Sequence, residues 1–520
     1  MLSECCLESD WYMAPFGQYQ QEILDEASGS KRFKPEVVLL VLDSPQWQVH
    51  QEDVEGFVKQ LSGAYPQAHI FLHNRLPVLA GPLKLMEWNM PGLDREAAAR
   101  MNLRIAETAR ALPNLSVLDL ERLFLERGAD RLLDPRLGYL AGIPWSAEGT
   151  REVARQAASA IAAFLGRRSK CLVLDLDDLL WGGKIGEEGL EHITLGQSGL
   201  GKAFHDLQKI ILRLHQSGIL LAVCSKNEEA TALEALQTHP DMVLRKEHLA
   251  GWRINWENKA QNIRSLAKEL NLGLDSFVFL DNSRHERALV RAQLPEVTVP
   301  ELPEDPVFFP QAVADLTCFE ALSLSAEDLK RGQMYVQARQ RKETRKQAVS
   351  LQAYLESLAL KVRVWEADPF TISRIAQLTQ KTNQFNLTTR CYTETEIRSK
   401  TGQAHWTVLA VSSKDRFGDD GLVGAALIEF GEEQAILDTF LVSCRVLGRG
   451  IETAFMAAVL SEIRKAGKKR CIARFIPTSK NKLVSRFLPD SGFTQNGDHW
   501  VRETAVPLAV PDWIGLCNGV

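Results

Sequence analysis

The stretch LVLDLDDLLWGG, from Leu172 to Gly183, constrains the fold of this chain more than any other feature of its sequence. An apolar run ends in two aspartates, Asp175 and Asp177, that are separated by one residue. Because side chains alternate along a strand, both carboxylates point to the same side. Open α/β sheets carry their chemistry at such strand ends. Two converging carboxylates predict Mg²⁺, which relieves their repulsion, although an ordinary buried strand before an acidic turn has the same pattern.

Length, charge and cysteine content indicate the class of protein. A chain of 520 residues predicts about three domains, and its 45% hydrophobic and 24% charged residues are typical of soluble globular proteins. The net charge of −5 is small for this length, so we expect no nucleic-acid partner. The nine cysteines lack metal-ligand spacing, which indicates reduced thiols in a cytoplasmic protein. The apolar run near the N-terminus is too short to cross a membrane, so we expect no membrane association.

Residues 1–165 predict an N-terminal α/β scaffold domain, which resembles an SGNH-like domain. Strand and helix patterns alternate there, which favours a parallel sheet. Asp43 and Ser44 follow the first strand, where a hydrolase nucleophile would lie, but no matching set of Ser, His and Asp follows. A scaffold or docking role is therefore favoured over catalysis. The expected strands are Val37–Leu42, His69–Leu72 and Leu115–Leu118, and the expected helices are Arg95–Leu112 and Arg151–Leu165 with Ser146 as cap.

Polar side chains follow two further apolar strands in the second predicted domain, residues 168–300. The strand ILLAVCSKN delivers Cys224 and Ser225, and the strand FVFLDNSR delivers Asp281. Lys259, in the motif NWENK, lies in the first turn of a helix between them. Because the ends of parallel strands meet at one edge of a sheet, we expect these groups to converge on the two aspartates of the first strand. This convergence is more specific than any single motif.

These side chains suit phosphoryl transfer through an aspartyl-phosphate. A carboxylate attacks phosphorus, and a second acid two residues later protonates the leaving oxygen. A hydroxyl and a lysine hold the phosphoryl oxygens, and Mg²⁺ neutralises the repulsion between carboxylate and phosphate. The residues available for these roles are Asp175, Asp177, Ser225, Lys259 and Asp281.

The order of these motifs resembles that found in the haloacid dehalogenase superfamily, and their amino-acid sequences are similar to those of one branch, the FkbH-like proteins. The shared motifs are LDLDxxLWGGxIGExG, AVCSKN, NWExK and LDSFVFLD. The resemblance implies a Rossmann-like catalytic domain and a Mg²⁺-dependent glyceryltransferase and phosphatase. Such an enzyme moves a glyceryl group from 1,3-bisphosphoglycerate to the phosphopantetheine thiol of an acyl carrier protein, with loss of phosphate. It would serve polyketide or related biosynthesis.

The same resemblance implies a role for each site residue. Asp175 would be the nucleophile and a metal ligand. Asp177 would be the general acid and base, and would bind the metal through its backbone carbonyl. Ser225 and Lys259 would hold phosphate, and Asp281 would be the third metal ligand.

Two positions depart from the family pattern. Leu179 stands where a threonine is usual, and Asn282 stands where a second aspartate is usual. The first change removes a hydroxyl near the nucleophile turn, and the second weakens the outer support of the metal. These departures leave an alternative open, in which the chain is a catalytically degenerate scaffold or docking protein.

Residues 301–349 are predicted as a linker followed by a helix. Four prolines between residues 300 and 310 indicate the linker. The charged stretch Ala326–Val349 is expected to be a solvated connecting helix, with acidic residues first and basic residues later, as the helix dipole favours.

Residues 350–510 are predicted as a third domain that resembles the Gcn5-related acetyltransferase α+β fold. The motif RVLGRG lies between a strand and a helix, where backbone N–H groups form a site for a pyrophosphate. Arg445, Gly448 and Gly450 would there hold the end of a pantetheine arm, and no acetyl transfer is implied. The expected strands are Thr407–Val411, Leu422–Phe430 and Ala435–Val442, followed by a helix from Ile451.

Two cysteines are candidates for an acyl-enzyme intermediate. Cys224 lies beside Ser225, and the charge of Lys226 is expected to lower its pKa. Cys444 lies beside the RVLGRG motif. Burial as a small apolar side chain is the alternative for each cysteine, and direct attack by the carrier thiol needs neither.

Overall fold

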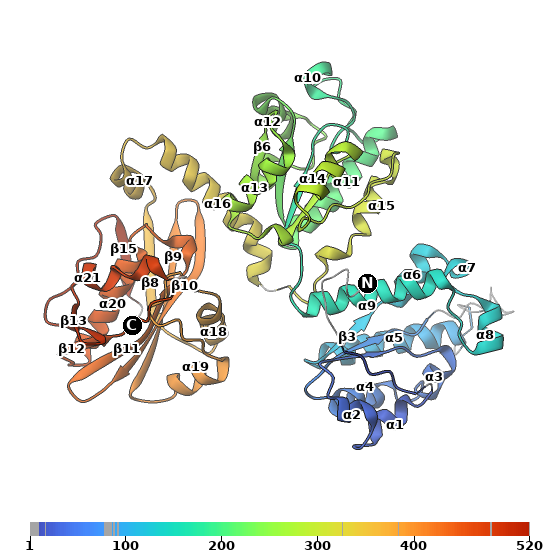
Figure 1. Ribbon diagram of the computed structural model, residues 1–520, viewed down its shortest axis with the longest axis horizontal. Coiled ribbons are helices and arrows are strands. Elements are labelled where there is room, and N and C mark those ends of the chain that lie inside the picture. Colours follow the sequence, from blue (N-terminus) through green and yellow to red (C-terminus); the bar gives the residue numbers. More distant parts are fainter. Residues whose placement is uncertain are drawn as a thin grey trace. The chain divides into compact units, whose positions relative to one another are not determined.

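Three sheets organise the chain in a computed structural model that describes residues 10–518, except 16, 77–85, 87, 88, 91, 92, 325, 383, 479 and 480. The chain divides into two compact units, Met1–Leu329 and Lys330–Val520. The first unit contains two of the sheets and the second contains the third (Figure 1). The domain boundaries proposed from the sequence within the first unit remain a prediction.

The N-terminal sheet is parallel, with the strand order β1-β2-β3. One face packs against α4 and α5 through a single apolar cluster, and Phe71 and Leu118 pack against α9 on the other face. Ser146 caps α9 by accepting the N–H of Gly149, as expected. Asp43 caps the short helix α3 (Ser44–Val49), which is a structural use of its carboxylate. The elements are β1 (Val37–Leu40), β2 (His69–His73), β3 (Leu115–Leu118), α4 (Val54–Ala64), α5 (Asp94–Arg110) and α9 (Ala147–Phe164).

The second sheet is also parallel, with the order β6-β5-β4-β7. Strands β4, β5 and β7 are fully buried and almost wholly apolar, as strands covered on both faces must be. This order places β4 between β5 and β7, so the ends of the three strands that carry polar residues lie side by side. The strands are β4 (Cys171–Leu174), β5 (Leu220–Ser225), β6 (Leu249–Ile254) and β7 (Phe277–Leu280), of which β6 was not expected from the sequence.

Helices of regular amphipathic pattern cover this sheet (Figure 1). The apolar side of α11 (Gly199–Gln216) packs on it, and α11 ends before Gly218, whose φ of +91° suits glycine. Helix α13 (Lys259–Leu270) contacts β5, β6 and α14 (Arg284–Gln293).

The proline-rich segment is part of this domain, so the prediction of a linker there is wrong. Leu302, Phe309 and Val313 are buried in the same apolar cluster as α11, and Phe309 begins the helix α15 (Phe309–Ala314). The prolines do not make this segment a free linker, because the burial of three large side chains attaches it to the core.

The C-terminal unit has one mixed sheet of eight strands, in the order β13-β14-β12-β11-β10-β9-β8-β15. Strands β8 to β11 are antiparallel neighbours, and α20 (Ile451–Lys465) connects β11 to its parallel neighbour β12. This layout is the acetyltransferase-like α+β fold expected from the sequence. The strands are β8 (Leu360–Glu366), β9 (Trp406–Asp415), β10 (Gly418–Phe430), β11 (Gln434–Val442), β12 (Arg470–Ala473), β13 (Thr494–Asn496), β14 (His499–Glu503) and β15 (Ile514–Asn518).

The charged helix α16 (Ala326–Gln347) is not simply solvated, which corrects a second expectation. Arg341 is buried and bonds Asp415 through Nε–Oδ2 and Nη2–Oδ1 distances of 2.6 and 2.8 Å. Asp420 contacts both Arg341, at 3.2 Å, and Arg449, at 2.9 Å. These two arginines and two aspartates form a buried ion cluster that joins α16 to the β9–β10 hairpin and to the RVLGRG loop.

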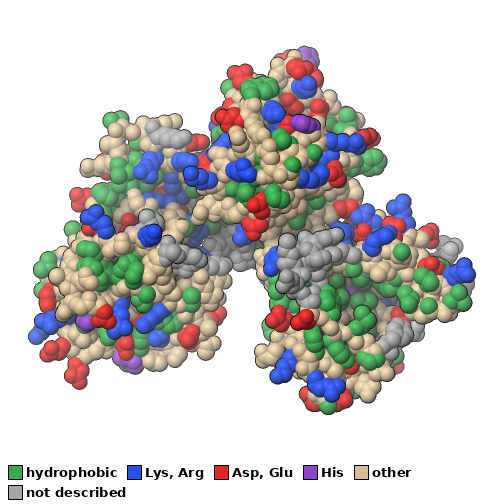
Figure 2. Space-filling view, viewed as in Figure 1, with side chains coloured by type: hydrophobic (Ala, Val, Ile, Leu, Met, Phe, Trp, Pro, Cys, Tyr) green, Lys and Arg blue, Asp and Glu red, His purple; other side chains and the backbone are tan. Residues whose placement is uncertain are grey.

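The surface carries charges of both signs. On the face shown in Figure 2, acidic and basic side chains are intermixed, in keeping with the net charge of −5. Among the described residues, no helix combines the length and the apolar character that a membrane span requires.

We predict that Arg341→Met lowers the free energy of unfolding of the C-terminal unit by about 3 kcal/mol, because Asp415 and Asp420 lose one of their two buried cations. Urea titration with hydrogen exchange of the β9 and β10 amides measures this. The control is Arg398→Met, since Arg398 and Glu394 are both about half exposed. Its effect should stay below about 0.5 kcal/mol. Equal effects of the two changes would contradict the role of the cluster.

Candidate active site

The carboxyl edge of the second sheet brings the predicted site residues together. Asp175 follows β4, Ser225 ends β5 and Asp281 follows β7. Asn258 caps α13 by accepting the N–H of Ala260, so Lys259 becomes the first residue of that helix and points its long side chain at the strand ends.

The Lys259 ammonium bridges two carboxylates at the centre of this edge. Its Nζ lies 2.8 Å from Oδ2 of Asp175 and 2.6 Å from Oδ2 of Asp281. The side chains of Lys259 and Asp281 are 3% and 0% exposed. Burial lowers the pKa of Lys259, but the charges of the two aspartates outweigh burial and hold it above its usual range. Burial, followed by the charge of Asp175, raises the pKa of Asp281.

The balance of charge at this edge fits a divalent cation. One ammonium faces two carboxylates, and Oδ1 of Asp175 is buried without a hydrogen-bond partner. Such an orphaned carboxylate oxygen is a ligand that Mg²⁺ prefers. Asp175 and Asp281 would supply two ligands, but no three acidic, histidine or cysteine side chains converge as ligands in the described chain. The other expected ligand, the backbone carbonyl of Asp177, is compatible with this and stays a prediction.

The side chain of Asp177 is held by three donors. Oδ1 accepts from the indole Nε1 of Trp181 at 2.9 Å and from the backbone N–H of Ile185 at 3.3 Å, and Oδ2 accepts from Nδ2 of Asn227 at 3.0 Å. Burial raises the pKa of Asp177, and the three hydrogen bonds oppose that effect. Sequence reasoning assigned no role to Trp181 or Asn227, although both lie inside motifs that it had identified.

The environment of Cys224 is the reverse of the one expected. The thiol is fully buried, and its nearest partner is the backbone carbonyl of Lys259 at 3.8 Å. Burial raises its pKa to about 12, so the prediction of a lowered pKa is wrong. Lys226 instead pairs with Glu286 at 2.6 Å. Alternation along β5 turns Cys224 away from the side on which Ser225 lies.

A buried arginine supports the last site loop. Arg287 on α14 donates from Nη1 to the carbonyls of Asp281 and Asn282, at 2.7 and 2.8 Å. The backbone N–H of Ser283 donates to Oδ1 of Asp281 at 2.8 Å. Backbone and arginine contacts therefore position Asp281 although Asn282 replaces the usual aspartate. Leu179, the other departure, is buried in the apolar core.

The RVLGRG loop of the C-terminal unit has the glycine geometry of a phosphate loop but uses its groups internally. Gly448 and Gly450 have φ of +75° and +86°, and Gly450 caps α20. Arg449 belongs to the buried ion cluster. Glu452 lies in the first turn of α20, and burial raises the pKa of its carboxyl. Binding of pantetheine through Arg445, Gly448 and Gly450 stays a prediction.

Strands β11 and β12 pair over only four residues each, and beyond this pairing the segment around Leu387 lies between the two chain segments. Leu387 donates its N–H to Phe440 on β11 at 3.1 Å and accepts the N–H of Ile476 at 2.9 Å. The N–H of Val442 bonds the carbonyl of Phe385 at 3.0 Å. The segment around Leu387 thus makes the hydrogen bonds that an inserted extended ligand would make.

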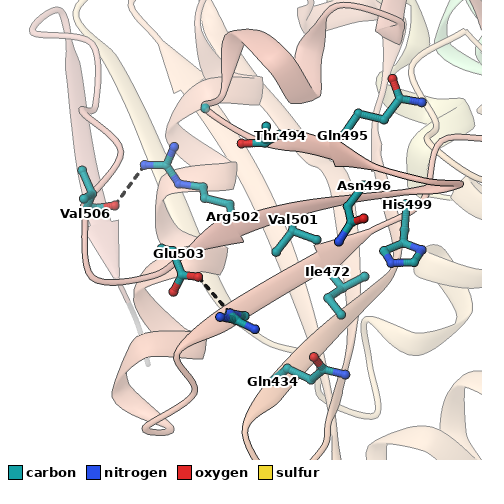
Figure 3. A pocket seen from close by; sticks show the side chains of 12 residues that line it. Gln434, Ile472, Thr494, Gln495, Asn496, His499, Val501, Arg502, Glu503 and Val506 are labelled. Atoms are coloured by element: carbon teal, nitrogen blue, oxygen red, sulfur yellow. Dashed lines mark hydrogen bonds and ion pairs between the residues drawn. The ribbon is translucent and has the colours of Figure 1, made fainter.

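Residues of β11, β12, β13 and β14 line a groove in the C-terminal unit (Figure 3). Its lining is mostly polar, with Arg470 and Glu503 paired at 2.9 Å across neighbouring strands. None of the side chains that line it is a predicted site residue, so it adds no chemistry to the site.

No protein-family model matches the chain, and no curated protein matches it either. Two solved acetyltransferases share low identity with it: a putative enzyme of the GNAT family from Desulfovibrio desulfuricans (16%; 28% of this chain and 99% of that one; TM-score 0.22) and the ribosomal-protein-S18-alanine N-acetyltransferase from Escherichia coli (12%; 29% and 96%; TM-score 0.23). The description of the C-terminal fold rests on its strand order.

A third solved structure is much more similar. It is the N-terminal part of the protein BF1531 from Bacteroides fragilis, which contains a phosphatase domain complexed with Mg. The identity is 31%, with a TM-score of 0.57, and the match covers 60% of this chain and 86% of that one. Sequence identity and coverage of this extent, together with the aspartates and lysine at the strand ends, show that the chain belongs to the haloacid dehalogenase superfamily of phosphatases.

Proposed function

We propose that the chain is a Mg²⁺-dependent phosphoryl-transfer enzyme that removes phosphate from a phosphorylated three-carbon acyl donor. The observation that carries this proposal is the buried bridge from Lys259 to Asp175 and Asp281. A buried cluster with one cation and two anions is costly unless a further cation completes it. A metal-dependent site accounts for such a cluster, because the bound metal ion supplies the missing positive charge.

Each side chain has a distinct part in the proposed reaction. Asp175 attacks the phosphorus, and Asp177 gives a proton to the leaving oxygen. Lys259 and Ser225 hold the phosphoryl oxygens, and Lys259 keeps Asp175 oriented. Asp175 and Asp281 would hold Mg²⁺, which when bound would neutralise the repulsion between carboxylate and phosphate.

The finer proposal concerns the acceptor. The resemblance to FkbH-like proteins supports 1,3-bisphosphoglycerate as donor and the phosphopantetheine thiol of an acyl carrier protein as acceptor, in polyketide or related biosynthesis. Asp175 would take the phosphoryl group of the 3-phosphate ester. The carrier thiol would form a bond to the acyl carbon while the bond from that carbon to the 1-phosphate breaks and inorganic phosphate leaves. The buried thiol of Cys224, with its raised pKa, is a poor nucleophile, which favours direct attack by the carrier thiol. Cys444 is exposed and remains the alternative acyl carrier within the chain.

Intact-mass measurement tests the acceptor. The full chain is incubated with Mg²⁺, 1,3-bisphosphoglycerate and a carrier protein bearing phosphopantetheine. We expect the carrier to gain one glyceryl mass and the enzyme to gain none. Loading that persists in Cys224→Ser but is lost in Cys444→Ser would contradict direct attack. Phosphate release without any carrier loading would refute the carrier thiol as acceptor but would still support phosphatase activity.

Asp175→Asn should abolish phosphate release, by at least about 1,000-fold, because an amide is a poor nucleophile and a poor ligand for Mg²⁺. Release is measured as inorganic phosphate. The matched control is Asp275→Asn, an exposed aspartate of the same domain, which should retain full activity. Wild-type rates in Asp175→Asn would refute an aspartyl-phosphate mechanism, and a wild type that releases no phosphate would favour the scaffold alternative.

Lys259→Met should lose activity and become unusually dependent on Mg²⁺ for stability. Without the ammonium, Asp175 and Asp281 repel each other, and a divalent cation between them replaces the missing charge. Adding Mg²⁺ should therefore raise the melting temperature of Lys259→Met more than that of the wild type, with EDTA as the reference condition. Lys268→Met, an exposed position on the same helix, is the control. An equal rise in all three proteins would argue against a metal beside Lys259.

A further inference from the structure

We propose that Arg75 is the centre of a binding site for a small carboxylate anion at the carboxyl edge of the first sheet. This site belongs to a different sheet from the proposed phosphatase centre and does not depend on its chemistry. The observation that carries the proposal is a buried guanidinium that no carboxylate of the described residues neutralises.

The backbone of Arg75 is held firmly at the end of the central strand β2. Arg75 follows two residues after His73, the last residue of β2, and is 1% exposed. The side chain of Asn102, on α5, accepts the N–H of Arg75 at 2.7 Å and donates to its carbonyl at 2.9 Å. The carboxylate of Glu121 bonds Asn102, at 3.1 Å. The guanidinium therefore has a fixed origin at the sheet edge where open α/β folds bind ligands.

The other buried arginines of the described chain are better compensated than Arg75. Two of them belong to the buried ion cluster of the C-terminal unit. Arg287 pairs with Glu301 at 2.9 Å, and Arg502 donates to two backbone carbonyls, at 2.5 and 2.9 Å. The side chain of Arg75 contacts only the neutral amide of Gln51, at 3.4 Å, and its Nε has no partner. Arg75 is thus the buried arginine that lacks an acceptor.

A second buried donor without an acceptor lies at the same edge. The indole Nε1 of Trp47, on α3, has no partner, and the side chain is 0% exposed. Its ring packs edge-on against His73, with a centroid distance of 5.7 Å. Gln51, just beyond α3, contacts Arg75. The segment from Trp47 to Gln51 therefore lies along the end of β2, and two unsatisfied donors meet there.

These donors require an acceptor that carries negative charge. An indole N–H and a guanidinium only donate hydrogen bonds. Arginine keeps its charge throughout the physiological pH range, so Arg75 cannot relieve its burial by losing a proton. An unpaired buried charge is costly, and a bound anion removes that cost. One positive charge balances one negative charge, and the planar fork of a guanidinium fits the two oxygens of a carboxylate.

The burial of Arg75 limits the ligand to a small one. Gln51 is exposed, and its amide is the group that contacts Nη1 of Arg75. A distance of 3.4 Å is long for a hydrogen bond, so a charged oxygen displaces this amide readily. We therefore infer that a small monocarboxylate enters beside Gln51 and pairs with the guanidinium.

Amide hydrogen exchange of β2 in the full chain tests this proposal. The amides of β2 lie between two neighbouring strands, so they exchange when the sheet opens. About 50 mM sodium acetate should slow the exchange of His69–His73 about 3-fold or more relative to the same concentration of sodium chloride, because acetate binds only the folded sheet. The amides of β5, in the second sheet, are the internal reference and should not respond.

Arg75→Met separates an anion site from a structural role. The change removes the charge and keeps an unbranched side chain, so in chloride β2 should exchange no faster than in the wild type, and acetate should have no effect. Arg110→Met, at an exposed position on α5, is the control and should respond to acetate as the wild type does. If Arg75→Met fails to fold, Arg75→Lys keeps the charge without the fork and should need at least about 3-fold more acetate.

Slower exchange in acetate that is lost in Arg75→Met and kept in Arg110→Met would support the proposal. A wild type that exchanges equally in acetate and chloride would overturn it. Exchange that is faster in Arg75→Met by the same factor in both salts would assign Arg75 a structural role and overturn it too. Slower exchange in inorganic phosphate but not in acetate would overturn the carboxylate as ligand. None of these results depends on phosphate release by the enzyme.

Discussion

The central physical constraint of this molecule is the buried ammonium of Lys259 between two carboxylates. A lysine that is 3% exposed needs compensating charge, and the strand order β5-β4-β7 supplies it by placing Asp175 and Asp281 at adjacent strand ends. The same geometry leaves one oxygen of Asp175 without a partner. The charge balance at this edge fits a further cation, and Arg287 and Asn258 hold the surrounding loop and helix in place.

Much of this site could be predicted because its residues stand at the ends of apolar runs. Asp175, Ser225 and Asp281 each follow such a run, and parallel strands bring their ends together. Trp181, Asn227 and Arg287 were not predicted as site residues, because their roles depend on where buried side chains point, which sequence periodicity does not give. The raised pKa of Cys224 was missed for the same reason, since only the packed sheet shows that the thiol is fully buried.

Fold prediction failed where burial overrode local composition. Prolines around residue 306 indicate a linker, yet Phe309 and Val313 are buried against α11. The charged composition of α16 indicates a solvated helix, yet Arg341 is buried because two aspartates on the β9–β10 hairpin neutralise it. Partners that are distant in sequence decide both cases, and neither partner is visible in the segment itself.

The two units use buried charge in opposite ways. In the C-terminal unit, two arginines meet two aspartates, and the segment around Leu387 makes backbone hydrogen bonds with both sides of the gap beyond β11 and β12. The charges of these arginines and aspartates are paired within the chain, which suits a rigid supporting structure. At the edge of β4, charge and hydrogen bonding remain incomplete around Asp175. Incomplete pairing at a buried position is costly unless something binds, and at this edge the unpartnered oxygen belongs to a carboxylate that also contacts a buried ammonium.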